Sequence, residues 1–171
     1  RIAAMAPRPL QPAELRARWL SMFERWDEMF ELAAGLMVDY RVYLLSNVGD
    51  MHWAHLDALY GIDSLAHGSC ASFRVGAIKP STEIYRKAEA MFELEPATTV
   101  FIDDLAPNVA GARDCGWHAI HHGDAAATRA QLRALGVLER VGRELAARPR
   151  PRRLPGILGR LLPSTAPPAP V

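Results

Sequence analysis

The stretch Val100-Phe101-Ile102-Asp103-Asp104 decides the fold, because three large apolar residues are followed at once by two carboxylates. A short continuous apolar run is typical of a strand that is buried on both faces of a parallel sheet. Two adjacent carboxylates need solvent or a cation beside them, since a buried charge without a partner is costly. The stretch therefore predicts a buried parallel strand whose carboxyl end carries an acidic pair.

Two more apolar runs have the same character. One covers residues 42–45 and ends at Ser46-Asn47, and the other covers residues 117–121. The segments around these runs show the three- and four-residue spacing of apolar positions that is typical of helices. They cover residues 54–60, 81–92, 108–113 and 126–147, and Ser81 is the expected N-cap of the second. Strands that alternate with helices predict an α/β fold with a Rossmann-like parallel sheet flanked by helices.

The chain changes character towards both ends. Before the first strand, apolar residues recur at helical spacing from Pro12 to Gly35 and predict one amphipathic helix. This stripe comprises Leu15, Trp19, Phe23, Trp26, Phe30 and Ala33. From about residue 148 the sequence is rich in Arg and Pro, which predicts disorder. A weak membrane-surface or partner-binding segment is the alternative for this tail.

Composition excludes several classes of function. The chain has 171 residues, half of them hydrophobic, which suits one globular domain. Twenty basic and nineteen acidic residues give a net charge of +1, so no nucleic-acid partner is expected. No apolar run approaches the ~20 residues that span a bilayer, and no signal peptide is evident, which predicts a cytoplasmic protein. Cys70 and Cys115 lack the spacing of a zinc site or disulfide framework and are expected to be reduced core thiols.

Three polar features follow the predicted strands or precede a helix. They are the pair Ser46-Asn47, Lys79 in the loop before the second helix, and the pair Asp103-Asp104. Open α/β sheets bind ligands along the edge formed by the carboxyl ends of their strands. A hydroxyl and an amide can donate to phosphoryl oxygens, an ammonium group can neutralise their charge, and carboxylates can hold a hard dication. These three features are chemically consistent with a site for a phosphoryl group and a dication, although each of them alone is a weak signal.

The order of these features resembles the second, third and fourth motifs of the haloacid-dehalogenase (HAD) superfamily. The matching stretches are Leu44-Leu45-Ser46-Asn47, Gly76-Ala77-Ile78-Lys79-Pro80 and Val100-Phe101-Ile102-Asp103-Asp104. The resemblance covers about residues 41–138 and includes Glu83-Ile84-Tyr85, Asn108, Gly111-Ala112-Arg113 and Gly116. Within the superfamily, residues 46–53 look most like the sugar-phosphatase-like branch and the phosphatase domain attached to some epoxide hydrolases.

The resemblance implies a role for each of these polar residues. Ser46 and Asn47 would hydrogen-bond the transferring phosphoryl group, and Lys79 would balance charge between that group and the nucleophile. Asp104 would ligate Mg²⁺, and Asp103 would support the metal through its water shell or ligate it directly. The implied activity is that of a magnesium-dependent phosphatase, which acts on a small phosphorylated metabolite through an aspartyl-phosphate intermediate.

The first motif of the superfamily, Asp-x-Asp after a buried strand, does not occur in this sequence. In the family its first Asp attacks phosphorus and its second acts as general acid and base. We expect this strand and most of a helical cap domain to lie upstream. Residues 1–38 are then the C-terminal remnant of the cap, residues 39–147 the core without its first strand, and residues 148–171 the tail.

In this superfamily the missing strand lies in the middle of the sheet. The chain as given is expected to be inactive, because it lacks the nucleophile. It is also expected to aggregate, because the loss of a central strand exposes sheet edges. The alternative function is a non-catalytic HAD-fold module for interaction or regulation. A receiver domain of phospho-signalling proteins is disfavoured, because receivers place the acidic pair before the Ser/Thr and Lys. The sequence predicts no oligomeric state.

Overall fold

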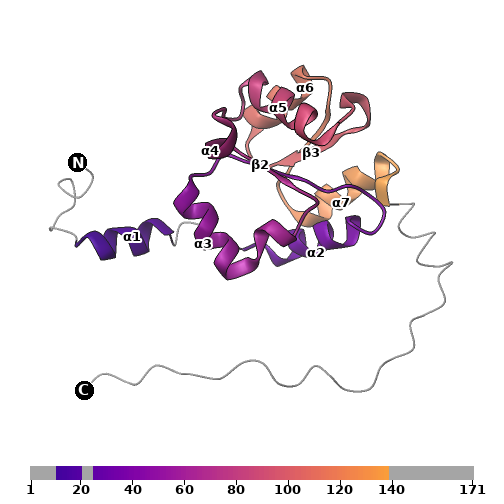
Figure 1. Ribbon diagram of the computed structural model, residues 1–171. Helices are drawn as coiled ribbons and strands as arrows, with labels where there is room; N and C mark the ends of the chain where they lie inside the picture. The colour runs from indigo at the N-terminus through magenta and orange to yellow at the C-terminus, as the bar shows by residue number, and fades with distance from the viewer. Residues whose placement is uncertain (1–10, 21–24, 139–171) are drawn as a thin grey trace, which may run out of the picture.

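The computed structural model describes residues 11–20 and 25–138 and confirms the α/β fold (Figure 1). The strands are β1 (Leu44–Ser46), β2 (Ser69–Ala71), β3 (Val100–Asp103) and β4 (His118–His121). The helices are α1 (Pro12–Leu20), α2 (Asp27–Leu36), α3 (Asp50–Tyr60), α4 (Ser72–Val75), α5 (Thr82–Phe92), α6 (Ala106–Asp114) and α7 (Ala125–Ala134). Short 3₁₀ turns η2 (Ile62–Ser64) and η3 (Pro96–Thr98) precede β2 and β3.

The strands form two separate parallel pairs. β1 lies beside β2 with Leu45 opposite Cys70, and β3 lies beside β4 with Ile102 opposite Ile120. Within the described residues, β1 and β3 are not paired with each other. A cavity of about 610 Å³ is lined by residues of both strands and of the helices around them. The parallel sheet is therefore present as two halves with a slot between β1 and β3.

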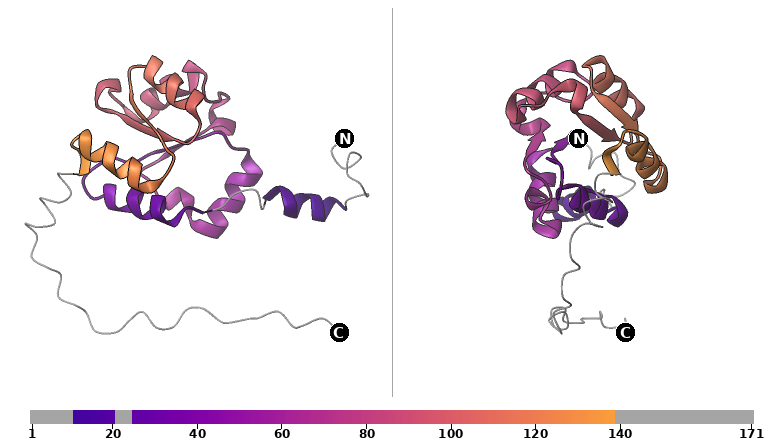
Figure 2. Two further views of the ribbon diagram at one scale, coloured as in Figure 1. Left: turned by 180° about the vertical axis from the view of Figure 1, so that it is seen from behind. Right: turned by 90° about the vertical axis from the view of Figure 1, so that its right-hand side faces the viewer.

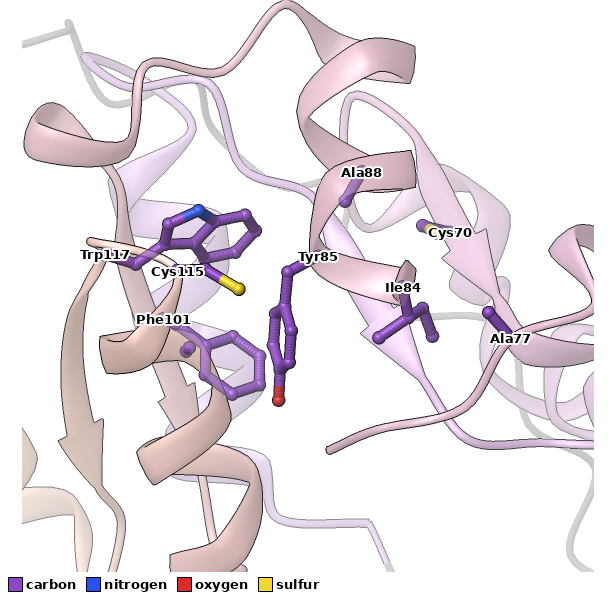
Figure 3. Packing of buried hydrophobic residues seen from close by; sticks show 9 residues of the cluster. Cys70, Ala77, Ile84, Tyr85, Ala88, Phe101, Cys115 and Trp117 are labelled. Atoms are coloured by element: carbon purple, nitrogen blue, oxygen red, sulfur yellow. The ribbon is translucent and has the colours of Figure 1, made fainter. Parts of the chain in front are cut away.

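Helices α5 and α6 cover one face of the two half-sheets. Ile84 and Tyr85 of α5 are fully buried in a cluster that also contains Cys70 of β2. In Figure 3 the Tyr85 ring lies between α5 and β3 and meets Phe101 and Trp117 edge to face, with ring centroids 5.8 and 5.5 Å apart. Helix α5 therefore packs on both half-sheets and holds them together.

Helices α2 and α7 cover the opposite face. Leu32 of α2 is 3% exposed and clusters with Ile120 of β4 and Leu132 of α7. Phe30 of α2 also meets Tyr60 of α3 edge on, with ring centroids 6.3 Å apart. In the right-hand view of Figure 2, α2 (indigo) closes the fold below and α5 (pink) above. The cap boundary proposed at residue 38 stays a prediction, although α2 packs on the α/β core.

The prediction of one continuous helix from Pro12 to Gly35 is wrong. Helix α1 ends at Leu20, and Trp26 has the extended backbone angles φ −97° and ψ 92° before α2 begins. The two helices pack on different partners, since Trp19 of α1 stacks on His52 of α3 with ring centroids 5.5 Å apart. A regular apolar spacing specifies which face is buried, but it does not specify that both halves are buried against the same surface.

The region between residues 68 and 80, where the sequence pattern predicts no strand and no helix, contains β2 and α4. β2 has three residues, which is too short to show an alternating pattern, and its position depends on pairing with β1. Towards the C-terminus, α7 ends at Ala134, whereas helical segments are predicted up to residue 147. Residues 139–147 and the tail predicted to be disordered lie outside the described residues.

The predicted cap of α5 and the predicted burial of both cysteines are confirmed. The Ser81 hydroxyl accepts from the backbone N–H of Glu83 at 3.3 Å and caps α5, and Gly61 ends α3 with φ 63°. Cys70 and Cys115 are buried and unbridged, and burial raises the pKa of both thiols. None of the helices in the described ranges is long and apolar enough to cross a membrane.

Candidate active site

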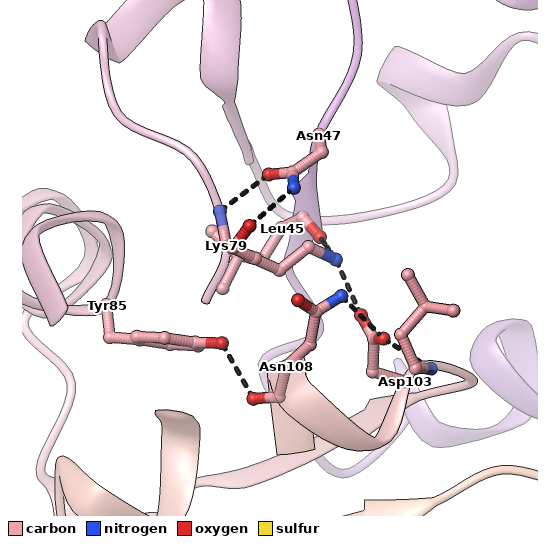
Figure 4. A network of polar contacts seen from close by, with 7 residues as sticks. Leu45, Asn47, Lys79, Tyr85, Asp103 and Asn108 are labelled. Atoms are coloured by element: carbon pink, nitrogen blue, oxygen red, sulfur yellow. Dashed lines mark hydrogen bonds and ion pairs between the residues drawn. The ribbon is translucent and has the colours of Figure 1, made fainter. Parts of the chain in front are cut away.

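The carboxyl ends of β1 and β3 bring the predicted polar residues to one edge of the fold. Ser46 is the last residue of β1 and Asn47 follows it, while Asp103 is the last residue of β3 and Asp104 follows it. Ser46 is half-buried, Asp103 is buried, and Asn47 and Asp104 are exposed. Lys79, from the loop between α4 and α5, reaches into this group (Figure 4).

Lys79 links the two half-sheets. Its Nζ donates to the backbone oxygen of Leu45 in β1 at 2.8 Å and to Oδ2 of Asp103 in β3 at 2.6 Å. The side chains of Lys79 and Asp103 are 9% and 6% exposed, so water screens this ion pair poorly. The ammonium group also lies 5.4 Å from the centroid of the Phe101 ring. A single ammonium group therefore bridges the carboxyl ends of β1 and β3.

Asn47 holds the backbone of residues 76–81, the loop between α4 and α5 that carries Lys79 and is called the lysine loop below. Its Oδ1 accepts from the N–H of Lys79 at 2.7 Å, and its Nδ2 donates to the Lys79 oxygen at 2.9 Å. These two bonds fix the loop on β1, and the peptide bond between Lys79 and Pro80 is cis. One Nδ2 hydrogen remains for another acceptor, because an amide group has two. The phosphoryl contact expected of Asn47 stays a prediction, beside the structural role seen here.

A second polar network fixes Asp103. Its Oδ1 accepts from the backbone N–H of Leu105 at 2.9 Å and from Nδ2 of Asn108 at 2.8 Å. The Tyr85 hydroxyl donates in turn to the Asn108 backbone oxygen at 2.7 Å. Burial, followed by the nearby charge of Asp103, raises the pKa of Tyr85 to about 12. The sequence pattern assigns no role to Tyr85 or Asn108. Asn108 could have been found as a candidate site residue, because it is a polar residue on the buried face of a predicted helix.

Ser46 and Asp104 are the two site residues whose side chains remain available. In the described part of the chain, no hydrogen bond or ion pair involves the Ser46 hydroxyl or the Asp104 carboxylate. The backbone oxygen of Asp104 contacts Nε2 of His121 at 2.9 Å, which holds this turn beside β4. An exposed carboxylate and a half-buried hydroxyl at one edge can meet a ligand without breaking an existing contact.

The described residues fit part of a magnesium site. Among them, no group of three or more His, Cys, Asp and Glu side chains gathers around one point. Mg²⁺ is commonly held by one or two carboxylates, with water and phosphate oxygens as its other ligands. Asp104 meets this requirement, whereas both oxygens of Asp103 already accept hydrogen bonds. The chain thus offers one open carboxylate for a hard dication and one that anchors Lys79.

Gly111 of α6 lies directly against the lysine loop. A Cβ atom at this position would lie 2.7 Å from the Pro80 backbone oxygen and 3.1 Å from Cε2 of Tyr85. We expect Gly111→Ala to lower the free energy of unfolding by about 1–3 kcal/mol, because backbone must shift to admit the methyl group. Urea denaturation followed by circular dichroism measures this loss. Gly123→Ala is the matched control, since nothing lies within 4 Å of its Cβ position, and equal losses in the two variants would contradict the predicted clash.

The chain is similar in sequence to known phosphatases. No protein-family model matches the chain. D-ribitol-5-phosphate phosphatase of Bacteroides thetaiotaomicron is 27% identical over 132 residues, which are 73% of this chain and 64% of that protein. A sesquiterpene phosphatase of Aspergillus oryzae is 31% identical over 94 residues, which are 55% of this chain and 48% of that protein.

A solved structure shows the same fold. The crystal structure of a HAD family enzyme from Bacteroides thetaiotaomicron, in complex with magnesium and inorganic phosphate, superposes with a TM-score of 0.62 at 25% identity. The match covers 70% of this chain and 64% of that one. This chain thus spans less than two thirds of the length of each of these three relatives.

The fold and the site together define the class of protein. Parallel strand pairs flanked by helices, with Ser46, Lys79 and the acidic pair at one edge, form an α/β core of the haloacid-dehalogenase type. The chain is similar to enzymes of the haloacid-dehalogenase superfamily, and the two curated proteins reported above are phosphatases.

Proposed function

We propose that this chain forms the part of a magnesium-dependent phosphatase site that binds the phosphoryl group and balances its charge. The observation that carries the proposal is the buried Lys79 ammonium group, which bridges the ends of β1 and β3 beside Ser46 and Asp104. A fixed cation in a sheltered site stabilises developing negative charge more strongly than one in water.

Each residue has a proposed task. The Ser46 hydroxyl and the remaining Nδ2 hydrogen of Asn47 would donate to phosphoryl oxygens. The Lys79 ammonium group would balance the negative charge of the phosphoryl group and of the attacking carboxylate. Asp104 would hold Mg²⁺, and Asp103 would keep Lys79 in place, with any contact to the metal made through water. When bound, Mg²⁺ would supply charge neutralisation to the phosphoryl oxygens.

The printed sequence contains no Asp-x-Asp, the motif that carries the attacking carboxylate in the superfamily that the chain resembles. We therefore propose that a segment outside the printed sequence supplies both the nucleophile, which forms an aspartyl-phosphate as the bond to the leaving group breaks, and the general acid. The chain's own residues bind and orient the phosphoryl group during this exchange. Alone, the chain would bind a phosphoryl group without turning it over.

The proposed substrate is a small phosphorylated metabolite, with sugar and sugar-alcohol phosphates as the first class to test. Supporting this choice are the similarity to D-ribitol-5-phosphate phosphatase and the branch resemblance of residues 46–53. Buried, unbridged Cys70 and Cys115 also suit the proposed cytoplasmic location, where thiols stay reduced.

Binding of inorganic phosphate tests the proposed site. We expect ³¹P NMR titration of the full chain to show binding that requires Mg²⁺ and weakens at least about tenfold, or ~1.4 kcal/mol, in Asp104→Asn. The matched control Asp114→Asn removes an exposed carboxylate at the end of α6 and should bind phosphate like the wild type. Hydrolysis of an aryl phosphate by the chain alone should not exceed the rate without protein.

Two results would count against the proposal. Phosphate binding that depends on neither Mg²⁺ nor Asp104 would reject the metal-dependent site and favour a non-catalytic HAD-fold module. Turnover of the aryl phosphate that requires Mg²⁺ and is lost in Asp104→Asn would show that the chain has a nucleophile of its own.

A further inference from the structure

We propose that a small cavity beside the candidate site, lined by Trp26 and His122, binds the hydroxyl-bearing carbon chain of the substrate. The cavity of about 300 Å³ lies where α2 and α7 begin. This volume is enough for a small organic ligand. That the ligand is a phosphate ester rests on the function proposed above, whereas the preference of the cavity for hydroxyl groups rests on the residues that line it.

The cavity lies at the same edge of the fold as Lys79 and the acidic pair. His122 follows directly after β4, whose carboxyl end lies beside that of β3, with His121 opposite Asp103. The Nε2 atom of His121 contacts the Asp104 backbone oxygen at 2.9 Å. Adjacent strands lie ~4.8 Å apart. One small molecule whose phosphoryl group binds near Asp104 can therefore extend into the cavity.

His122 presents an open ring nitrogen to this cavity. The residue is 7% exposed, and its Nδ1 contacts the Thr128 hydroxyl of α7 at 2.7 Å. Among the described residues, Nε2 has no hydrogen-bond partner, and no fully buried side-chain nitrogen or oxygen lacks one. Nε2 is therefore accessible from the cavity that His122 lines. It donates or accepts according to the tautomer, and an alcohol hydroxyl can meet either role.

Trp26 supplies an aromatic wall beside His122. The two ring centroids are 4.9 Å apart, and Trp26 is 49% exposed although it belongs to the apolar stripe between residues 12 and 35. Its extended backbone precedes α2, and its side chain lines the cavity at the start of α7. A half-exposed indole offers an apolar face together with one N–H donor. The C–H groups of a polyol can pack on this face while its hydroxyls reach polar neighbours.

Carboxylates complete the wall and favour hydroxyl donors. Asp27, Glu28 and Asp124 line the cavity, and none of the described residues that line it is Lys or Arg. The Asp124 carboxylate accepts from the Ala127 N–H at 2.7 Å. The Asp27 carboxylate lies 2.6 Å from the Arg25 guanidinium group. In the part of the chain that the structure describes, the Glu28 carboxylate has no contact, so it can accept from ligand hydroxyls.

The electrostatics of the cavity disfavour both charged classes of ligand. Its three carboxylates repel an anion, so the phosphoryl group belongs at Lys79 and not in the cavity. The amino ends of α2 and α7 both lie at the cavity, and their helix dipoles place partial positive charge there. This charge disfavours an ammonium group. A neutral chain of hydroxyl-bearing carbons, as in sugar and sugar-alcohol phosphates, meets both conditions.

NMR spectroscopy of the full chain with Mg²⁺ tests this inference, with ribitol 5-phosphate, ribitol and inorganic phosphate as probes. The chain has four Trp residues, and the indole N–H signal that disappears in Trp26→Phe belongs to Trp26. We expect ribitol 5-phosphate, and ribitol at high concentration, to shift this signal and inorganic phosphate to leave it in place. Ribitol 5-phosphate should bind at least about tenfold more tightly than inorganic phosphate, because one ligand then occupies both sites.

Matched variants separate the cavity from the phosphate site. Trp26→Ala and Glu28→Ala should each weaken the binding of ribitol 5-phosphate at least about threefold and leave that of inorganic phosphate unchanged. Both side chains are exposed, so their loss should not prevent folding. Glu31→Ala removes an exposed carboxylate of α2 outside the cavity and should bind both probes like the wild type.

Three outcomes would overturn the inference. The first is Mg²⁺-dependent phosphate binding that is no tighter for ribitol 5-phosphate and leaves the Trp26 signal unmoved, in which case the proposed phosphatase site stands without this cavity. The second is an equal loss of ribitol 5-phosphate binding in Glu28→Ala and Glu31→Ala. The third is a larger shift of the Trp26 signal by phosphoethanolamine, which would assign the cavity to a cation.

The two unphosphorylated and phosphorylated arms also separate this inference from the proposed function. If neither phosphate probe binds but ribitol shifts the Trp26 signal, the proposed phosphatase site is rejected and the cavity keeps its preference for hydroxyl groups. If no probe binds at all, both are rejected.

Discussion

Lys79→Met is expected to lower the free energy of unfolding by about 3–5 kcal/mol, because it removes one partner of a buried ion pair. The Asp103 carboxylate, 6% exposed, would keep its bonds from Leu105 and Asn108 but lose its counter-charge. The Leu45 oxygen would lose its donor as well. Urea denaturation at the lowest concentration that gives a usable circular dichroism signal measures the loss and limits aggregation.

Two comparisons isolate the unpaired charge as the cause. The double variant Lys79→Met/Asp103→Asn should be more stable than Lys79→Met alone, since both charges are then removed from the interior. Lys87→Met is the matched surface control. Lys87 forms an ion pair with Glu83, whose side chains are 37% and 60% exposed, and its Nζ donates to the Val75 oxygen at 2.6 Å. Loss of both contacts should cost about 1–2 kcal/mol, less than the loss of the buried pair. A double variant no more stable than the single variant would rule out the buried-charge explanation.

The Tyr85→Phe substitution is expected to lower the free energy of unfolding near neutral pH and to raise it, relative to the wild type, at alkaline pH. Near neutral pH the variant loses the bond to the Asn108 oxygen and should be about 1 kcal/mol less stable than the wild type. At alkaline pH the sign changes. The pKa of Tyr85 is raised from 10 to about 12, so the wild type keeps its full stability below pH 10 and loses it as the pH rises towards 12.

The size of this loss follows from proton linkage. The rise in the pKa of Tyr85 from 10 to about 12 corresponds to roughly 3 kcal/mol of the free energy of unfolding. The wild type loses this amount as the pH rises from the pKa of the unfolded chain to that of the folded chain. The stability curves of the wild type and Tyr85→Phe should therefore cross at about pH 11. Denaturation from pH 8 upwards in both proteins measures the crossing. Curves that stay parallel would mean that the Tyr85 hydroxyl ionises equally well in the folded and unfolded chain.

The sequence by itself determined the features that depend on neighbours in the chain. The strand before Asp103-Asp104 follows from an apolar run that meets a polar pair, and the Ser81 cap follows from local hydrogen bonding. The order of Ser46, Lys79 and the acidic pair points to the superfamily. The resemblance to that superfamily also implies a central strand outside the printed sequence, which stays a prediction.

Only the tertiary structure decided how these residues meet. Lys79 reaches Asp103 across 24 positions of the chain and Leu45 across 34. Contacts between distant segments also explain three other features. Asn47 holds the lysine loop, the short β2 pairs with β1, and the chain breaks between α1 and α2. A local pattern shows which side chains will be buried, but the packing of the whole chain selects their partners, since many arrangements satisfy the same pattern.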